Sequence, residues 1–324
     1  MLITENKYFY LDRPYESSIK HTMRSLIKRL SALKYKTLIT MAKGAIAGEK
    51  KYKVSICAIF KDEGQYLEEW IEFHLIVGIE HFYLYNNGSS DNYIQVLKPY
   101  IDNNIVTLID YPGKQMQMKA YEHAISNFRN ETKWLGFIDL DEFVVPLKNT
   151  NVYEVLREFN NKAPSVLIYW KVFGSSGLME RDDNKLVVEQ FLLSYPKLAD
   201  IGKCFYNTDY EYAFNSERNS LLHHVLWCRS GNNLLPPVNL HNHVSFGGYN
   251  IIDSYSLPIQ INHYVTKSYK DYYYKTNGKT DVYYENNPRK TEQFFKIDNR
   301  CTVQDFSATR FLVKLKVNMG ETLT

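Results

Sequence analysis

From about residue 53 onward, short apolar runs alternate with segments whose apolar residues recur at helical spacing. Residues 54–60 form an apolar run typical of a buried strand, and residues 81–85 and 105–109 repeat that pattern. Between these runs, apolar positions three and four residues apart predict helices near residues 67–75, 94–101 and 117–128. A further strand runs through Trp134 into an acidic stretch. This alternation predicts an α/β fold with a mainly parallel, Rossmann-like central sheet and helices on both faces.

Polar side chains follow three of the predicted strands at the point where each strand ends. In chain order they are Lys61-Asp62-Glu63, Asn86-Asn87 and Asp139-Leu140-Asp141. In open α/β sheets, ligands bind at the carboxyl ends of the strands. We therefore expect these three groups to meet at one ligand site.

The two aspartates of the last group, Asp139 and Asp141, are spaced to point to the same side of an extended chain. Two carboxylates at the end of a buried strand repel each other and are costly to desolvate. A divalent cation between them removes both problems, and oxygen ligands suit Mg²⁺ or Mn²⁺. The spacing alone is weak, because a chain of this length should contain about one Asp-x-Asp by chance.

Three regions differ in their pattern. Residues 1–50 form a basic, amphipathic N-terminal segment, and residues 51–300 hold the main domain, which becomes less regular and richer in Tyr and Asn after about residue 150. Residues 301–324 form a C-terminal tail in which residues 302–317 favour a short amphipathic helix.

The N-terminal segment contains no acidic residue between Ser17 and Gly48. Its basic residues flank an apolar stripe at helical spacing made of Ile19, Met23, Leu26, Ile27, Leu30 and Leu33. One interpretation is a helix that rests on anionic lipid through residues 18–44. The other is a helix packed on the domain with a solvated basic face.

Composition and charge narrow the class of protein. The net charge of +3 is too small to indicate nucleic acid as a partner. No apolar run reaches the length of a membrane span, and the N-terminus lacks the apolar core of a signal peptide. The four cysteines are scattered without a C-x-x-C pair, which favours free thiols in a reducing compartment. These features together predict a cytoplasmic protein.

Six short motifs occur in one order along the chain. They are Lys61-Asp62-Glu63 with Leu67-Glu68-Glu69-Trp70, Tyr85-Asn86-Asn87-Gly88-Ser89-Ser90-Asp91, Gln117-Met118-Lys119-Ala120-Tyr121, Ile138-Asp139-Leu140-Asp141-Glu142-Phe143, Trp170-Lys171-Val172-Phe173-Gly174-Ser175-Ser176-Gly177 and Asn262-His263-Tyr264-Val265-Thr266-Lys267-Ser268. In this order they resemble the motifs of glycosyltransferase family 92 and its family 2-like bacterial relatives. The resemblance covers roughly residues 54 to 280.

The resemblance implies a GT-A fold, with a Rossmann-like nucleotide half joined to a more irregular acceptor half. It also implies transfer of a sugar from a UDP-linked donor with inversion at the anomeric carbon, and galactose is the favoured sugar. The implied acceptor is a glycan or lipid-linked glycan in surface polysaccharide or lipooligosaccharide synthesis. An enzyme with this role is expected in the cytoplasm, where a basic N-terminal helix would place it at the inner membrane face.

The family motifs also imply a metal and phosphate site. Asp139 and Asp141 would hold Mn²⁺ or Mg²⁺ on the donor diphosphate, and His263 matches the late histidine of the family as a third ligand. Lys267 would pair with a phosphate oxygen. The alternatives are a hydrogen-bonded core histidine at position 263 and a surface lysine at position 267.

Four further residues are implied in binding the nucleotide sugar. Lys61, Glu63 and Asn86 lie where this fold type places base and ribose contacts, and Gln117 could contact the nucleotide or serve as an ordinary helix N-terminal residue. Two positions depart from the family pattern: Asp62 replaces an Asn, and Asn86 replaces an Asp. An amide at position 86 can still accept from uracil N3–H, but it is uncharged and can also donate.

An inverting transfer needs a general base near the acceptor hydroxyl. Glu180, Asp182 and Asp183 follow the motif at residues 170–177, and Asp182 is the single candidate that we select. The alternative is an exposed polar turn. Glu142 could contact the acceptor or sugar, or it could orient the metal ligands.

A group of potential zinc ligands lies outside these motifs. It consists of His223, His224, Cys228, His241 and His243. Their spacing matches no standard zinc module, so structural zinc is a minor alternative.

Three other classes of protein share some of these features. A haloacid-dehalogenase-like phosphatase also has an apolar strand that leads into Asp-x-Asp, but Glu142 and Phe143 replace the small residues that usually follow. A sugar nucleotidyltransferase should show a Gly-rich, Arg-containing loop where this chain has Lys61-Asp62-Glu63-Gly64. A scaffold or glycan-binding subunit with this fold could have lost catalysis, although the aspartates and His263 are intact.

Overall fold

A nine-stranded mixed sheet organises the part of the chain that the computed structural model describes, which is residues 18–42, 49–213, 224–242, 244, 257–278 and 291–320. The strands are β1 Tyr52–Phe60, β2 His81–Asn86, β3 Val106–Asp110, β4 Thr132–Phe137, β5 Glu142–Pro146, β6 Ser165–Val172, β7 Leu193–Ser194, β8 Gly202–Asn207, β9 Glu211–Tyr212, β10 Cys228–Ser230, β11 Asn233–Leu235, β12 Val238–Asn239, β13 Ile259–His263 and β14 Val303–Gln304. The helices are α2 Ser18–Ala42, α3 Gly64–Ile76, α4 Tyr93–Asp102, α5 Gln117–Phe128, α6 Val152–Leu156, α7 Val187–Gln190, α8 Tyr269–Gly278, α9 Thr291–Asp298 and α10 Leu312–Asn318, with 3₁₀ turns η1 Arg157–Phe159 and η4 Thr309–Phe311.

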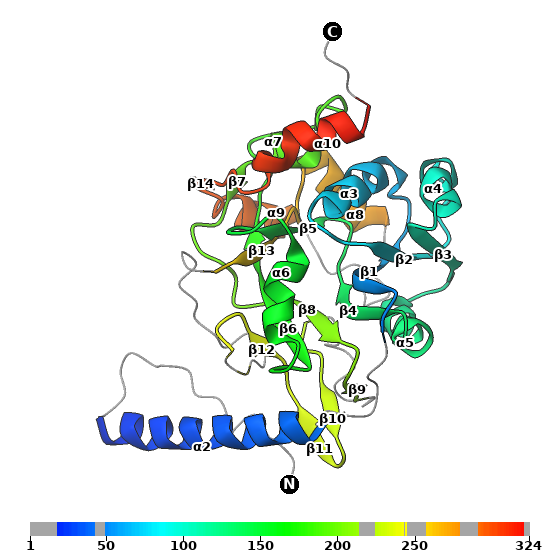
Figure 1. The fold of residues 1–324 in the computed structure, drawn as a ribbon. Coiled ribbons are helices and arrows are strands. Elements are labelled where there is room, and N and C mark those ends of the chain that lie inside the picture. The colour runs from blue at the N-terminus through cyan, green and yellow to red at the C-terminus, as the bar shows by residue number, and fades with distance from the viewer. Residues whose placement is uncertain are drawn as a thin grey trace.

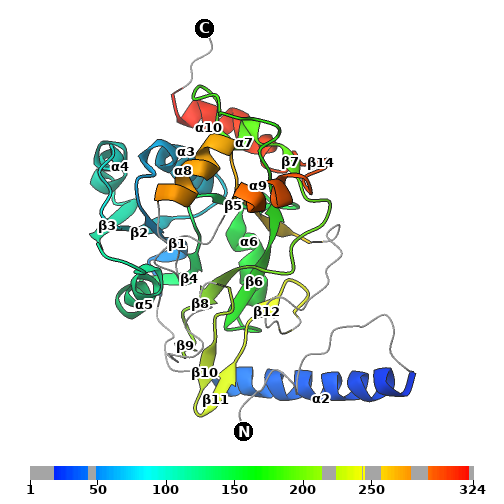
Figure 2. The ribbon, with the colours of Figure 1, turned by 180° about the vertical axis from the view of Figure 1, so that it is seen from behind.

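The sheet has a parallel half and a mixed half. Its order is β3-β2-β1-β4-β8-β6-β13-β5, with β12 paired to β6. Strands β3, β2, β1 and β4 are parallel, whereas β8 runs antiparallel to both β4 and β6. In Figures 1 and 2, α3 and α4 lie on one face of the parallel half and α5 on the other. The expected α/β fold, with a largely parallel central sheet and helices on both faces, is confirmed.

The parallel half follows the strand–helix pattern of the sequence closely. Helix α5 spans Gln117–Phe128, as its apolar spacing predicts, and β1 begins two residues before the apolar run at 54–60. Trp70 on α3 and Trp134 on β4 are fully buried, so both large side chains belong to the core. Burying such apolar surface supplies most of the driving force for folding.

A glycine lets the two halves of the sheet approach closely. Gly136 on β4 pairs with Phe205 on β8, and a Cβ added at Gly136 would lie 2.5 Å from the Phe205 ring. Only glycine therefore tolerates this contact without a shift of the ring. Because β8 runs antiparallel to β4, Lys203 lies two residues beyond this pair, towards the end of β4 and its acidic loop.

Strand β13 brings the late histidine to the same end of the sheet. Its antiparallel pairing with β5 places His263 opposite Glu142, and its parallel pairing with β6 places His263 beside Val172. Residues more than a hundred positions apart in sequence therefore meet next to the acidic loop.

The two end regions pack on the domain in different ways. Helix α2 contacts β10 and β11 through buried Tyr35, Leu38 and Ile39. In the C-terminal region a short helix was expected over residues 302–317. The structure has β14, η4 and then α10, which spans only Leu312–Asn318 and packs on α3. Among the described residues, no helix is long and apolar enough to cross a membrane.

Candidate active site

The acidic loop Asp139-Leu140-Asp141 connects β4 to β5 at the carboxyl end of the parallel half. Glu142 fixes this loop, since its Oε2 accepts from the Asp139 backbone N–H at 2.9 Å and its own N–H donates to the Asp139 carbonyl at 3.0 Å. The Tyr264 backbone N–H donates to the Asp141 carbonyl at 2.8 Å. The loop is therefore held by backbone bonds, which leave the two aspartate carboxylates for other partners.

Asp139 accepts hydrogen bonds from three side chains on two elements, α5 and β8. Its Oδ1 accepts from Gln117 Nε2 at 2.8 Å and from the Tyr121 hydroxyl at 3.1 Å. Its Oδ2 accepts from Lys203 Nζ at 2.6 Å. Lys203 is fully buried, and its Nζ also lies 3.4 Å from Glu142 Oε2. One buried ammonium thus contacts the carboxyl groups of both Asp139 and Glu142.

Asp141 has a different set of neighbours. Its Oδ2 accepts from Lys275 Nζ on α8 and lies 3.7 Å from His263 Nε2. The ring of His263 packs against Trp170, with their centroids 4.5 Å apart. The carboxylate of Asp141 is largely buried, so a positive charge beside it has a strong effect.

The lysines keep both aspartates ionised. Burial alone would raise the pKa of Asp139, but the Lys203 ammonium outweighs it and the pKa is lowered. Burial opposes ionisation of Asp141 as well, yet Lys275 and His263 hold the pKa of that carboxyl well below its usual range. Both carboxylates are therefore anionic at neutral pH and able to bind a cation.

Burial shifts the pKa values of both Glu142 and His263 towards their neutral forms. Burial raises the pKa of Glu142 well above its usual value, and the anionic Asp139 adds to that shift. Burial lowers the pKa of His263, against the opposing pull of Asp141. A neutral imidazole has a free ring nitrogen, which is the form that binds metal ions.

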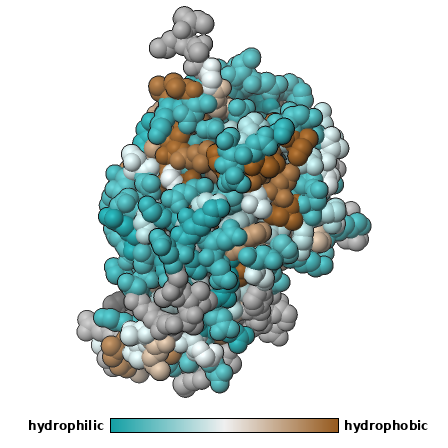
Figure 3. Space-filling model, turned by 45° about the vertical axis from the view of Figure 1, so that its right-hand side comes forward, coloured by the Kyte–Doolittle hydropathy of each residue, from teal (hydrophilic) through white to brown (hydrophobic). Residues whose placement is uncertain are grey.

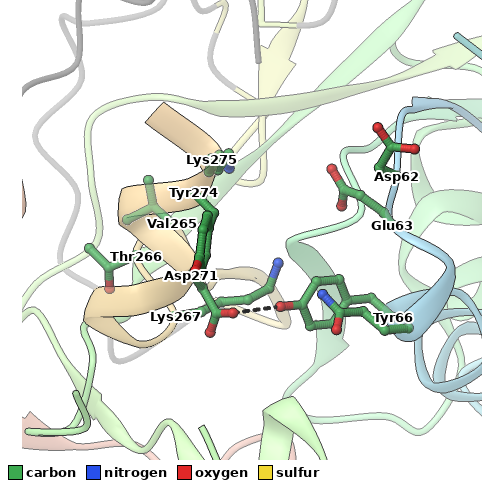
Figure 4. A pocket seen from close by; sticks show the side chains of 10 residues that line it. Asp62, Glu63, Tyr66, Val265, Thr266, Lys267, Asp271, Tyr274 and Lys275 are labelled. Atoms are coloured by element: carbon green, nitrogen blue, oxygen red, sulfur yellow. Dashed lines mark hydrogen bonds between the residues drawn. The ribbon is translucent and has the colours of Figure 1, made fainter. Parts of the chain in front are cut away.

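A cavity of about 400 Å³ adjoins this cluster. Figure 4 shows that one wall comes from the loop after β1 and the start of α3, and the other from the segment after β13 and α8. Lys275 lines the cavity and also binds Asp141, so the acidic loop and the cavity are parts of one site.

Two residues in these walls have strained backbones. Asp62 and Lys267 have φ values of 50° and 48°, in the left-handed region that non-glycine residues rarely adopt. Such strain persists where the surrounding structure enforces it, which is often at functional sites. Thr266, which also lines the cavity, has a buried hydroxyl oxygen with no hydrogen-bond partner among the described residues.

Tyr66 joins the two walls of the cavity. Its hydroxyl donates to Asp271 Oδ1 at 3.1 Å, as the dashed line in Figure 4 shows. Lys267 Nζ lies 3.8 Å from the centroid of the Tyr66 ring, and the guanidinium of Arg181 lies 4.8 Å from it. The ring therefore holds two cations at the cavity.

The residues predicted to contact the nucleotide sugar occupy different positions around this site. Glu63 lines the cavity, and Lys61 is exposed just before it. Gln117 reaches Asp139. Asn86 is the last residue of β2, where its amide donates to Tyr93 and Asp110 and its oxygen accepts from the Ser89 backbone N–H at 2.8 Å. In the described structure, the Asn86 side chain therefore connects the end of β2 to Ser89, α4 and β3.

Asp182 lies in an exposed loop beside the cavity. Its Oδ1 accepts from the Asn184 backbone N–H at 3.0 Å, and these turn contacts lower the pKa of Asp182. The preceding Arg181 donates to Gln65 at 2.6 Å, and Gln65 lines the cavity. The loop therefore borders the site, while the Asp182 carboxylate caps its own turn.

The donor set fits a divalent cation. Asp141 supplies an anionic oxygen and His263 a neutral nitrogen, and the Lys275 ammonium shows that a cation is accommodated on Asp141. Within the described ranges, no three His, Cys, Asp or Glu side chains converge as a ready metal site. Asp139 is bound by Lys203, so the three-ligand set remains a prediction.

The alternative zinc group is only partly described. His223 and His243 lie outside the described residues. His224 Nδ1 lies 2.6 Å from the Gly202 carbonyl oxygen, and Cys228 is buried on β10. The described ranges again hold no metal cluster that includes them.

The sequence predictions missed the two lysines that bind the aspartates. Lys203 carries a detectable signal, because it interrupts an otherwise apolar stretch, residues 201–206, where an unpaired buried ammonium would be very costly. Lys275 stands in a polar, tyrosine-rich segment that gives no such signal.

Comparison with known proteins identifies the family. The family model described as glycosyltransferase family 92 matches residues 50–310. The chain therefore belongs to glycosyltransferase family 92. Membership favours sugar transfer over the phosphatase and nucleotidyltransferase alternatives.

Several curated relatives match shorter segments. A glycosyltransferase family 92 protein of Ricinus communis is 28% identical over 145 residues, covering 44% of this chain and 26% of the relative. A beta-1,4-galactosyltransferase of Caenorhabditis elegans is 31% identical over 155 residues, covering 43% and 36%. A galactan beta-1,4-galactosyltransferase of Arabidopsis thaliana is 34% identical over 110 residues, covering 30% and 22%. The chain spans little more than a third, or less, of the length of these relatives.

Solved structures of S. aureus TarS are more distant. A crystal structure of TarS covers 84% of this chain and 76% of its own at 11% identity, with a TM-score of 0.36. A TarS complex with UDP covers 58% and 60% at 14% identity, also with a TM-score of 0.36. Superpositions at this level do not define a shared binding site.

Proposed function

We propose that this chain is a metal-dependent, inverting glycosyltransferase that moves a sugar from a UDP-linked donor to a glycan or lipid-linked glycan acceptor. The observation that carries the proposal is the pair Asp141 and His263 beside a cavity, at the carboxyl end of the parallel strands of a family 92 chain. Galactose is the first sugar to test, because two relatives are named as galactosyltransferases. The proposed setting is cytoplasmic synthesis of a surface polysaccharide or lipooligosaccharide.

Asp141 and His263 are the residues that would hold the divalent cation, Mn²⁺ or Mg²⁺. When bound, such an ion offsets the negative charge that develops on the leaving diphosphate. Asp139 lies two residues away and adds negative charge, but its direct partner is Lys203. We therefore assign Asp139 to positioning Gln117 and the loop, and Asp141 to the cation.

The cavity residues would bind the donor. Lys267 provides a fixed positive charge for a phosphate oxygen, since its ammonium is already held over Tyr66. Glu63 lines the cavity and can accept hydrogen bonds from ribose or base. Lys61 stands at the exposed rim of the same wall.

The transfer itself requires removal of a proton from the acceptor. As the acceptor oxygen bonds to the anomeric carbon, its proton passes to a base and the bond from that carbon to the diphosphate oxygen breaks. Attack from the face opposite the leaving group inverts the anomeric centre. We assign the base role to Asp182, because its loop borders the cavity through the contact of Arg181 with Gln65.

The proposal is tested by incubating the full chain with UDP-sugars, UDP-galactose first, in the presence of Mn²⁺. We expect slow release of UDP that EDTA abolishes and that excess Mn²⁺ restores. Absence of both UDP release and a nucleotide-dependent thermal shift, across common donors, would favour a scaffold. Phosphate release from simple phosphoesters would favour a phosphatase.

The base assignment has its own test. Asp182→Asn should lower kcat with the true acceptor by roughly 10²- to 10⁴-fold, the usual contribution of a general base. Asp183→Asn is the matched control, because Asp183 lies next in the same exposed loop and pairs with Arg181. Equal activity of the two variants would remove Asp182 from the mechanism.

A further inference from the structure

Helix α2 carries a row of large apolar side chains that face solvent. Their exposed fractions are 73% for Ile19, 63% for Met23, 60% for Leu30, 65% for Leu33 and 73% for Met41. At about 100° per residue, these five positions fall within an arc of roughly 80° on the helix surface. The α2 stripe, as we call these five residues, extends along nearly the whole helix.

The opposite side of α2 is the side that packs on the domain. Tyr35, Leu38 and Ile39 are buried, and they are centred roughly 140° around the helix from the stripe. The Tyr35 hydroxyl donates to the Pro236 carbonyl at 2.7 Å. In Figures 1 and 2 only the C-terminal end of α2 meets β10 and β11, and the rest extends along the lower end of the molecule. The stripe is therefore presented outward by a helix that is already fixed.

The charge of α2 is strongly one-sided. Residues 18–42 contain no Asp or Glu, whereas the whole chain has 36 acidic residues against 39 basic ones. The basic residues of the helix are Lys20, Arg24, Lys28, Arg29, Lys34 and Lys36. A surface that covers the α2 stripe must accept an apolar row within a positively charged segment.

An anionic lipid surface meets both requirements. Apolar side chains of an interfacial helix enter the boundary between headgroups and acyl chains, and nearby Lys and Arg attract anionic headgroups. A second copy of the chain would bring two segments of the same positive charge together, which opposes association. None of the described helices can span a membrane, so the helix would lie along the surface. We propose that α2 docks the protein on an anionic membrane through the α2 stripe.

This inference rests on α2 alone and does not depend on the proposed sugar transfer.

Figure 3 shows apolar atoms on the surface at the lower end of the molecule, where α2 lies, and further apolar areas towards the upper end. At that upper end α10 exposes Val313 and Val317, at 78% and 62%. The two valines provide a matched control, because they are equally exposed but lie far from α2.

The test is flotation of the full chain with vesicles of phosphatidylcholine alone or mixed with phosphatidylglycerol. We expect binding to the mixed vesicles that weakens at high salt, and weak binding to phosphatidylcholine alone. Leu30→Asp with Leu33→Asp should reduce binding at least about tenfold, whereas Val313→Asp with Val317→Asp should leave it unchanged. Equal unfolding temperatures of the two double variants would show that the α2 changes leave the fold intact.

Three results would overturn the proposal. The first is no binding of the wild-type chain to the mixed vesicles, and the second is equal binding to neutral vesicles, which would remove the role of charge. The third is a wild-type dimer that the Leu30 and Leu33 changes dissociate without any effect on vesicle binding, which would assign the stripe to a second copy.

Discussion

The two aspartates of the acidic loop lie two residues apart but have lysine partners of opposite character. Asp139 is bound by Lys203, which comes from the central strand β8 and has no exposed side-chain surface. Asp141 is bound by Lys275, which comes from α8 at the cavity and has 29% of its side-chain surface exposed. The first lysine is part of the folded sheet, whereas the second can leave for solvent.

This difference separates two roles that the Asp-x-Asp spacing alone does not distinguish. A fully buried ammonium cannot be displaced without leaving the buried Glu142 and the partly exposed Asp139 without their shared partner. A partly exposed ammonium on a helix can be replaced by another cation at much lower cost. We infer that Asp139 is a fixed structural acid and that Asp141 is the exchangeable cation site.

The largest expected effect follows removal of the buried lysine. Lys203→Met leaves the buried Glu142 carboxyl and the partly exposed Asp139 carboxylate without their ammonium, which should lower the free energy of unfolding by about 3 kcal/mol. Denaturant unfolding followed by circular dichroism measures this loss. Lys133→Met is the control, because Lys133 pairs with Asp209 nearer the surface and should cost about 1 kcal/mol or less. Equal losses for the two variants would contradict a special role for Lys203.

A smaller loss of folding stability is expected when the pH is lowered. A buried histidine should cause this loss at a higher pH than the aspartates do. His74 is buried, with its Nδ1 2.8 Å from the Trp70 carbonyl and its Nε2 accepting from the Val144 N–H, and burial lowers the pKa of His74 to about 3. The unfolded chain then binds more protons, so stability falls as pH drops below the ordinary histidine value. From pH 7 to pH 5 this costs roughly 2 kcal/mol.

The two aspartates should not change their protonation between pH 7 and pH 5. The pKa values of Asp139 and Asp141 are lowered in the folded chain, so the stability that they contribute is present above the ordinary carboxyl pKa and is lost only at more acid pH. Denaturation curves at pH 7 and pH 5 should therefore differ less in His74→Leu than in the wild type. In Asp141→Asn, the curves at pH 7 and pH 5 should differ by as much as in the wild type. A smaller difference in Asp141→Asn would contradict the assignment of the acid effect to His74.

The smallest effect concerns the exchangeable lysine. Lys275→Gln removes a competing cation from Asp141, so Mn²⁺ should bind about tenfold more tightly, or about 1.4 kcal/mol. Isothermal titration calorimetry with Mn²⁺ measures this change. Lys270→Gln is the control, because Lys270 is on the same helix but pairs with the exposed Glu180. Weaker Mn²⁺ binding by the Lys275 variant would show that Lys275 supports the site instead of competing for it.

Sequence patterns predicted the parallel half well because each strand–helix unit is local. The spacing of apolar residues in α5 and the apolar run in β1 are readable without knowledge of any distant contact. The burial of Trp70 and Trp134 follows from the same spacing of apolar residues.

The partners of the site could not be predicted in the same way, because they arrive through sheet pairing and a distant helix. Lys203 is 64 residues from Asp139, and Lys275 is 134 residues from Asp141. Asn86 stays a predicted nucleotide contact, and its amide donates to Tyr93 on α4 and Asp110 on β3. Side-chain destinations of this kind depend on the whole fold and not on a motif.

The most direct measurement of the central claim is Mn²⁺ binding, followed by electron paramagnetic resonance with UDP present, for Asp141→Asn and Asp139→Asn side by side. Unfolding curves of both variants confirm that each is folded under the conditions used. We predict that Asp141→Asn lowers the Mn²⁺ affinity at least about a hundredfold and that Asp139→Asn changes it by less than about tenfold. Equal losses in the two variants, or normal binding by Asp141→Asn, would contradict the separation of roles.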